Sequence, residues 1–281
     1  MDLLGRGYTR EELLVCTKGG FLTPDGDMPA DAGEYFQREY VDTGILREGD
    51  VAAGCHSMAP RFLADQLERS RRNLGIETID VYYLHNPETQ LGDVPREMFN
   101  NRVRAAFEFL ESAVAAAKIH FYGMATWNTF RQDETAADYL SLSAMESLAR
   151  DVAGGSHHFR FVQLPCNLGM TEALTRSNQR VDGRQLPMVE AANALGIRLV
   201  ASAAMLQGKL SRGLPPFVSA ALGLNNDAER ALQFVRSTPG IATALVGMSS
   251  LEHVRANLSL VGVPPASQDQ FSKLFERGRQ A

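Results

Sequence analysis

The sequence predicts an α/β fold in which parallel β-strands alternate with α-helices. Three observations predict it. Short apolar runs alternate with amphipathic runs, the apolar runs are continuous, and helix-boundary residues stand at the ends of the amphipathic runs. Continuous apolar runs indicate strands buried on both faces, as in a parallel sheet. No biased linker divides the chain, so we expect a single domain over residues 1–281.

The strands are predicted from six segments rich in Val, Ile, Leu and Tyr. They are residues 13–21, 78–86, 118–126, 160–167, 198–203 and 242–248. The helices are predicted between and after these segments, at residues 59–74, 100–117, 139–152, 186–195, 226–236, 251–260 and 267–279. Pro60 suits a first helical turn, and Gly75 and Gly196 suit positions just beyond a helix end. Residues 1–12 read as the tail of a helix that leads into the first strand.

Six successive strand–helix units build either a doubly wound sheet or a barrel, since both use right-handed crossovers. A (β/α)8 TIM-type barrel needs eight units of roughly 30 residues, so this chain supplies about six of the eight. Six barrel strands leave two long apolar edges unpaired. We therefore expect a chain that is unstable, oligomeric, or lacking about 60 N-terminal residues.

Composition limits the classes of function. The net charge of −5 argues against a nucleic-acid or anionic-membrane surface, and no apolar run reaches the ~18 residues of a membrane span. Cys16, Cys55 and Cys166 are too few and too far apart for a disulfide framework or a CxxC metal site. The first residues do not form a signal peptide. These features indicate an intracellular, cytoplasmic protein, although a shortened start would hide a targeting segment.

Polar residues follow the predicted strands, where βα barrels place their active sites. Lys18 precedes Gly19-Gly20 and is either a cation in the barrel mouth or a solvated strand-end lysine. His85 is either a neutral imidazole that hydrogen-bonds a substrate oxygen or a core histidine. The serine-capped turn before His253 is either an anion site or a well-capped helix. The other strand-end residues are Asn86, Thr126, Trp127, Asn128, Gln163, Asn167 and Ser202.

Metal and phosphate-loop sites find little support. His157 and His158 precede a strand, on the face that barrels use for stability, and His56 and His120 have no partner at ligand spacing. Neither GxGxxG nor GxxxxGK[ST] occurs. The long insert 22–57, which carries Tyr35, Phe36 and Tyr40, is either part of a lid or a surface excursion.

An ordered set of motifs resembles the aldo-keto reductase superfamily from about residue 11 to residue 262. The motifs are VCTKGG (15–20), QLERSRRNLGIETIDVYYLHNPE (66–88), KIHFYGMATWN (118–128), FVQLPCN (161–167), GIRLVASAAMLQGKL (196–210) and STPGIATALVGMSSLEHVRANL (237–258). The resemblance implies a (β/α)8 barrel that binds NADP(H) and moves a hydride between nicotinamide and a small carbonyl or alcohol substrate.

The resemblance also implies a catalytic tetrad of Asp, Tyr, Lys and His. Lys18 matches the lysine that lowers the pKa of the tyrosine, and His85 matches the histidine that orients the carbonyl. The Asp and Tyr belong to the second βα unit of the family, which this chain lacks. No tyrosine of this chain is therefore assigned as the acid, and we expect impaired catalysis.

The cofactor residues are carried over from the same resemblance. Gln163 matches the glutamine that holds the carboxamide, and Thr126 stands where the family often has a hydrogen-bonding residue. Ser202 replaces the aromatic ring that usually stacks on nicotinamide. The adenosine and phosphate side is assigned to Lys209, Gly247, Met248, Ser249, Ser250, His253 and Asn257. The weak positive charge of this turn favours NADP(H) and does not exclude NAD(H).

Three readings of the function remain open at this point. The chain is an N-terminally truncated carbonyl reductase, a non-catalytic NADP(H)-binding or regulatory protein on the same fold, or a metal-dependent barrel hydrolase. The third is the weakest, because suitable ligands do not recur at the strand ends.

Overall fold

The computed structural model describes residues 6–276. Its main sheet has six strands in the order β1-β4-β5-β6-β9-β10, and the pairs β1·β4, β4·β5 and β9·β10 are parallel. The bounds are β1 Cys16–Gly19, β4 Ile79–His85, β5 Ile119–Ala125, β6 Phe159–Pro165, β9 Arg198–Ser202 and β10 Ile241–Ala244. These strands confirm the predicted α/β fold with six parallel strands. β10 is shorter than the predicted run 242–248.

The predicted helices are present, with small shifts at their ends. They are α3 Pro60–Leu74, α4 Arg96–Ala115, α5 Leu142–Ala153, α7 Met188–Ala194, α9 Asp227–Ser237, α10 Leu251–Leu258 and α11 Gln268–Glu276. The predicted end of the last helix, at residue 279, lies outside the described residues. Only Arg10–Glu12 is helical before β1 within the described chain, as a 3-10 turn.

Helix ends follow the chemistry that the sequence indicated. Pro60 occupies the first turn of α3, where its missing N–H removes no helical hydrogen bond. Gly75 ends the same helix at φ 64°, and Gly196 follows α7 at φ 67°. This left-handed conformation is available to glycine without steric cost, so it stops the helix cleanly.

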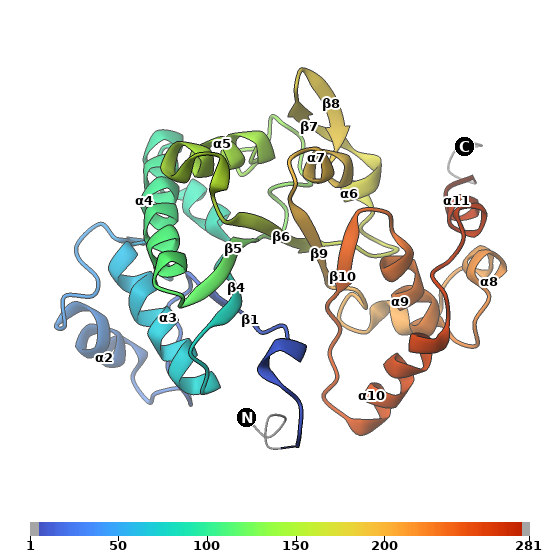
Figure 1. Ribbon diagram of the computed structural model, residues 1–281, viewed down its shortest axis with the longest axis horizontal. Coiled ribbons are helices and arrows are strands. Elements are labelled where there is room, and N and C mark those ends of the chain that lie inside the picture. The colour runs from blue at the N-terminus through green and yellow to red at the C-terminus, as the bar shows by residue number, and fades with distance from the viewer. Residues whose placement is uncertain (1–5, 277–281) are drawn as a thin grey trace. The chain divides into compact units, whose positions relative to one another are not determined.

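Contacts along the chain group it into two compact units, Met1–Phe161 and Val162–Ala281. In the first unit, α3 and α4 lie beside β4 and β5 (Figure 1). The inward face of α4 buries Phe99, Val103, Phe107 and Leu110 completely. The ring of Phe107 lies 5.0 Å from that of Tyr122 in β5, so helix and strand share one aromatic core.

The insert after β1 has structure that the sequence did not predict. It contains α2 Ala32–Phe36, a π-helical turn Gln37–Val41, and a small hairpin of β2 Val51–Ala52 and β3 His56–Ser57. Tyr40 and Leu46 of the insert are buried against Phe62 of α3. Since these side chains are almost fully buried, the insert is a packed layer on α3 in this structure.

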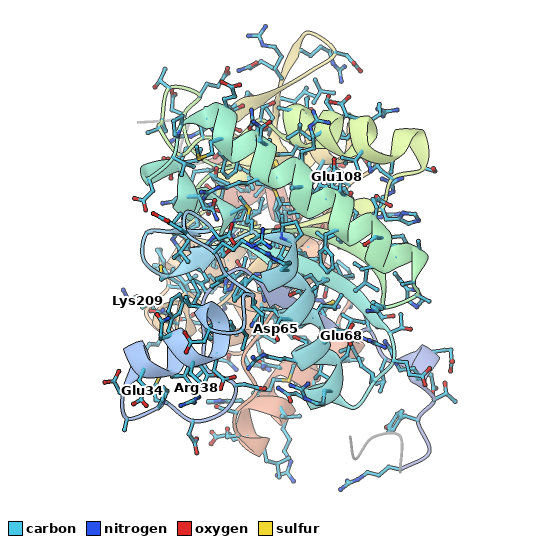
Figure 2. All side chains as sticks on the ribbon, turned by 90° about the vertical axis from the view of Figure 1, so that its left-hand side faces the viewer. Glu34, Arg38, Asp65, Glu68, Glu108 and Lys209 are labelled. Atoms are coloured by element: carbon cyan, nitrogen blue, oxygen red, sulfur yellow. The ribbon has the colours of Figure 1, made fainter. Side chains whose placement is uncertain are left out.

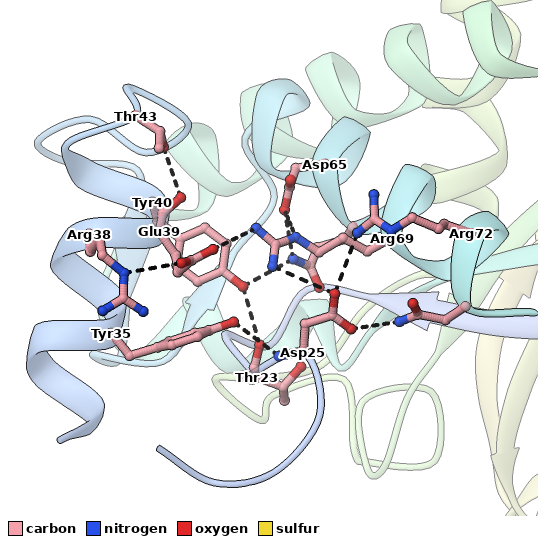
Figure 3. A network of polar contacts seen from close by, with 12 residues as sticks. Thr23, Asp25, Tyr35, Arg38, Glu39, Tyr40, Thr43, Asp65, Arg69 and Arg72 are labelled. Atoms are coloured by element: carbon pink, nitrogen blue, oxygen red, sulfur yellow. Dashed lines mark hydrogen bonds and ion pairs between the residues drawn. The ribbon is translucent and has the colours of Figure 1, made fainter. Parts of the chain in front are cut away.

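Charged contacts reinforce this layer (Figure 3). The Arg69 guanidinium of α3 donates to Asp65 at 2.7 Å and to Glu39 of the insert at 3.4 Å. It also lies 5.4 Å from the centre of the Tyr40 ring. Figure 2 shows further charged side chains on this unit, among them Glu34 and Arg38 of the insert and Glu108 of α4.

The second unit is built on β9, β10 and their helices. α9 buries Ala231, Phe234 and Val235, and the ring of Phe271 in α11 stacks on Phe234 at 5.4 Å. An antiparallel hairpin of β7 Ser177–Val181 and β8 Arg184–Pro187, also absent from the sequence prediction, precedes α7. Two short helices, α6 Glu172–Thr175 and α8 Pro216–Leu222, complete the unit. Within residues 6–276, no helix is long and apolar enough to cross a membrane.

Candidate functional site

Lys18 lies in the first unit, near the carboxyl end of β1 and in register with Tyr83 of β4. Its side chain is half-buried, and its Nζ lies 6.0 Å from the centre of the Tyr83 ring. Burial lowers the pKa of the Lys18 ammonium below its ordinary value. In the stretch 6–276, no carboxylate is paired with this amine.

His85 ends β4, two residues beyond Tyr83 on the same face of the sheet. Burial, and secondarily the positive charge of Lys18, lower the pKa of His85. The imidazole is therefore neutral at neutral pH. The ring of Phe21 approaches it edge-on, with the ring centres 5.0 Å apart.

A buried polar chain fixes the backbone at His85, and the sequence gave no sign of it. The Nε2 of His56 lies 2.7 Å from the carbonyl oxygen of His85, and Gln90 Nε2 lies 3.0 Å from His56 Nδ1. Arg102 in turn donates to Gln90 at 2.7 Å. Burial lowers the pKa of His56 to about 4. A neutral ring that donates from Nε2 and accepts at Nδ1 satisfies every contact.

Gly20 is required by the same cluster. A Cβ at this position would lie 2.7 Å from His56 Nε2 and 3.0 Å from the His85 carbonyl, and its φ is +143°. Gly19 is equally confined, because a Cβ there would lie 2.0 Å from the hydroxyl of Tyr82. The Gly-Gly pair beside Lys18 therefore allows three chain segments to approach closely at the strand end.

Glu88, which sequence reasoning also passed over, holds the loop after β5. Its Oε1 accepts the Trp127 N–H at 2.8 Å, and its Oε2 is buried with no hydrogen-bond partner. Burial raises the pKa of Glu88 to about 7, because the ionised form would be poorly solvated. Thr126, which the sequence analysis assigned to the cofactor site, directly precedes Trp127 and is buried. The only sign of Glu88 in the sequence was its place in the Pro87-Glu88 pair shortly after the strand that ends at His85.

The second unit carries a pocket of about 660 Å³ at the end of β9 and at α10. Four residues assigned from the sequence line it: Gly247, Ser249, His253 and Asn257. Gln207, Gly208 and Ser211 line it as well. Its described lining contains no Asp, Glu, Lys or Arg, so it offers neutral donors and acceptors with no carboxylate to repel an anion.

The other residues that the sequence analysis assigned to the cofactor do not line this pocket. Ser250 caps α10 by accepting the His253 N–H at 3.2 Å, and Lys209 stands between the lining residues Gly208 and Ser211. Ser202 is the last residue of β9. Met248 lines a second, neighbouring pocket of mixed polar and apolar residues instead. Gln163 is buried in β6.

Metal chemistry gains no support from the described residues. Among residues 6–276, no cluster of three His, Cys, Asp or Glu side chains has metal-binding geometry. His157 lies 3.2 Å from Glu146, and His158 lies 2.8 Å from Glu111. Both histidines directly precede β6, so they lie at its amino end and not at its carboxyl end. The two carboxylates, of which Glu146 is buried and Glu111 partly buried, connect α5 and α4 to the start of β6 through these histidines.

Comparison with known proteins assigns the fold to a family. The solved holo form of aldo-keto reductase AKR11C1 from Bacillus halodurans matches 98% of this chain and 74% of its own, with TM-score 0.61 and 16% identity. A protein provisionally assigned as 2,5-diketo-D-gluconic acid reductase B matches 98% of this chain and 71% of its own, with TM-score 0.60 and 15% identity. No curated protein sequence matches. The model of the Aldo/keto reductase family matches residues 3–214, and the chain therefore belongs to that family.

Proposed function

We propose that this chain is an NADP(H)-binding oxidoreductase polypeptide whose chemistry is hydride transfer between the nicotinamide and a carbonyl or alcohol carbon. The observation that carries the proposal is the pocket of the second unit. It has a size typical of ligand sites, and four residues assigned to the cofactor from the sequence line it: Gly247, Ser249, His253 and Asn257. Family membership supports an oxidoreductase, and NADP(H) as the cofactor is our inference.

The lining suits the phosphate and adenosine part of a dinucleotide. Ser249 and Ser250 precede α10, whose first N–H groups carry a partial positive charge. Asn257 lies two turns further along the same helix and offers amide hydrogen bonds to a base. His253 stands between them. NAD(H) fits the same contacts apart from a 2′-phosphate, so we rank it second.

The residues of the first unit would act on the carbonyl. The neutral imidazole of His85 donates an N–H to the substrate oxygen, and the His56 contact to its backbone holds that strand end in place. When bound, the nicotinamide supplies or accepts the hydride. Lys18 matches the family lysine, but no tyrosine of this chain is assigned as the proton donor that such a lysine would activate.

We therefore expect little reductase turnover from residues 1–281. A positioned proton donor contributes about 10²–10⁴-fold to such a reaction, and the assigned set here lacks one. The second candidate is a protein that binds NADP(H) through the same pocket without catalysis. Turnover of aldehydes at rates ordinary for an enzyme, about 1–10³ s⁻¹, would exclude the second candidate and show that another group donates the proton.

We also place the protein in the cytoplasm.

NADPH binding to the full chain, followed by fluorescence titration and a thermal melt, tests the proposal. We expect saturable binding and a raised melting temperature, since a ligand that binds only the folded state stabilises it. Ser249→Asp, which puts a carboxylate into the pocket, should abolish both effects. Ser272→Asp adds the same charge on exposed α11 and should leave them unchanged. Wild-type protein that neither binds nor gains stability would contradict the proposal.

A further inference from the structure

The buried chain of hydrogen bonds behind His85 has a donor-only group at one end and an acceptor-only group at the other. At the first end, Nη1 of Arg102 in α4 donates to Gln90 Oε1 at 2.7 Å. At the second, His56 Nε2 lies 2.7 Å from the carbonyl oxygen of His85. Between them, Gln90 Nε2 lies 3.0 Å from His56 Nδ1. The side chains of Gln90 and His56 are completely buried, so bulk water does not replace these contacts.

The two ends of this chain leave its protons a single arrangement. A guanidinium has no acceptor, so the Gln90 atom that faces Arg102 is the amide oxygen, and the NH2 group faces His56. The Nδ1 of His56 must then accept, which puts the ring proton on Nε2. Nε2 is the atom that meets the His85 carbonyl, and a carbonyl only accepts. Every donor in the chain therefore points from Arg102 towards His85.

The chain ends on a peptide group in an unusual conformation. Asn86, directly after His85, has φ 45° and ψ 57°, a left-handed conformation that is unfavourable for most residues with a side chain. The peptide between the two residues is held on both sides, since His56 binds its carbonyl and the Ala125 carbonyl accepts its N–H at 2.6 Å. Such a conformation persists only where its surroundings hold it. Loss of the His56 contact would therefore release one side of the peptide that sets the direction of His85.

Arg102 joins three segments of the first unit at the start of this chain. Its Nη2 donates to the Gly49 carbonyl of the insert at 2.6 Å, so the guanidinium is bound to the insert as well as to the loop after β4. The insert and that loop also meet directly, because the Ala53 N–H donates to the Asp93 carboxylate. The guanidinium of α4 is thereby held in one orientation, which fixes the orientation of the Gln90 amide.

We propose that Arg102 is a positioning residue for His85. It orients the Gln90 amide, the amide sets the tautomer of His56, and that tautomer holds the peptide that follows His85. The inference rests on the proposed function, which places the His85 imidazole on the substrate oxygen. Without Arg102 the Gln90 amide is free to turn over, so that His56 can carry its proton on Nδ1. In that tautomer Nε2 has no proton to donate, and the hydrogen bond to His85 is lost.

The first measurement is a nitrogen NMR spectrum of the histidine side chains in the full chain at pH 7, with His56 assigned by the loss of its signals in His56→Asn. We expect a neutral His56 ring with its proton on Nε2, and a proton on Nδ1 would overturn the proposal. Gln90→Glu puts an acceptor-only carboxylate of almost the same shape beside Nδ1, kept ionised by Arg102. Since Nε2 still faces the His85 carbonyl, both ring nitrogens should then be protonated. An unchanged His56 ring would overturn the proposed chain.

Arg102→Met tests the positioning of His85 in the same spectrum. We expect His56 to show both tautomers and the ring signals of His85 to shift. Arg104→Met is the matched control on the same helix, because Arg104 pairs with Asp151 at 3.0 Å and takes no part in the chain. It should leave both rings unchanged. A His85 ring that does not respond to Arg102→Met would overturn the proposal. NADPH is absent from all these measurements, so a failure here is distinct from a failure of the pocket to bind it.

Discussion

The strand end around Lys18 and His85 and the pocket around Gly247 and His253 are built in opposite ways. At the strand end, Gly20, His56 and Gln90 are buried and in contact, and the backbone of His85 is fixed by a neighbouring ring. In the pocket, Gly247, Ser249 and His253 are exposed, and an added Cβ at Gly247 would meet nothing within 4 Å. The difference teaches that the chemical groups of this chain are positioned by folding, whereas its pocket leaves room for a ligand to complete the contacts.

The largest effect we expect is a difference in stability between alanine variants of two glycines, Gly20 at the strand end and Gly247 in the pocket. Gly20→Ala should lower the free energy of unfolding by about 2–4 kcal/mol, because the new methyl group meets His56 and the residue has a positive φ. Gly247→Ala should change it by less than about 0.5 kcal/mol. Urea denaturation of both variants measures the contrast, and equal effects would break the comparison.

The next effect is a pair of opposing pH dependences in the first unit. The pKa of His56 falls from 6.5 to about 4 on folding, so its contribution to stability is complete above pH 6.5 and is lost as the pH falls towards 4. The pKa of Glu88 rises from 4.5 to about 7, so its contribution is complete below pH 4.5 and is lost as the pH rises to 7. Each amounts to about 3 kcal/mol, and they largely cancel.

Single variants should uncover the two slopes. Glu88→Gln should become more stable as the pH rises from 4.5 to 6.5, and His56→Asn should become less stable over the same range. Denaturant unfolding at several pH values measures both, each relative to its own value at pH 5.5 so that the loss of packing drops out. Parallel curves for the two variants and the wild type would show that neither group titrates as its burial requires.

The smallest effect should appear at the pocket. Asn257→Ala should weaken NADPH binding about tenfold, the loss of one or two hydrogen bonds, while the unfolding free energy changes by less than about 0.5 kcal/mol. Asn225→Ala makes the same change at an exposed position of the same unit outside the pocket and should alter neither quantity. Titration and melting of the two variants measure this, and a stability loss at Asn257 as large as at Gly20 would contradict an open pocket.

Local signals predicted much of the fold. The apolar runs located every strand of the main sheet, and Pro60 and Gly75 bounded α3 to within a residue. The hairpin of β2 and β3 and that of β7 and β8 were missed because all four strands are short, two to five residues, and three of them are rich in polar residues. β10 ends at Ala244, earlier than predicted. The Leu245 N–H still donates to the Ala201 carbonyl of β9 at 2.8 Å, but residues 246–248 are not part of the strand, although their composition is that of a strand.

Sequence reasoning found the candidate site residues that stand directly after a recognisable strand. It missed those whose importance depends on a contact with a residue far along the chain. Lys18 and His85 follow recognisable strands, and Gly247 to Asn257 form one continuous stretch. His56 was passed over because its contacts are a backbone oxygen 29 residues away and an amide 34 residues away. Glu88 was passed over because only burial beneath the loop after β5 distinguishes it from a surface glutamate.

The contact between Glu88 and Trp127 gives the protein a built-in optical reporter. The chain has one tryptophan, and its backbone N–H is bound by the carboxyl group of Glu88. The indole itself is 43% exposed, at the boundary between protein and water where emission is sensitive to nearby charge. Ionisation of Glu88 near pH 7 places a negative charge beside the backbone of the only tryptophan of the chain. We therefore expect the emission of Trp127 to change as the pH passes through 7, and the change to be absent in Glu88→Gln.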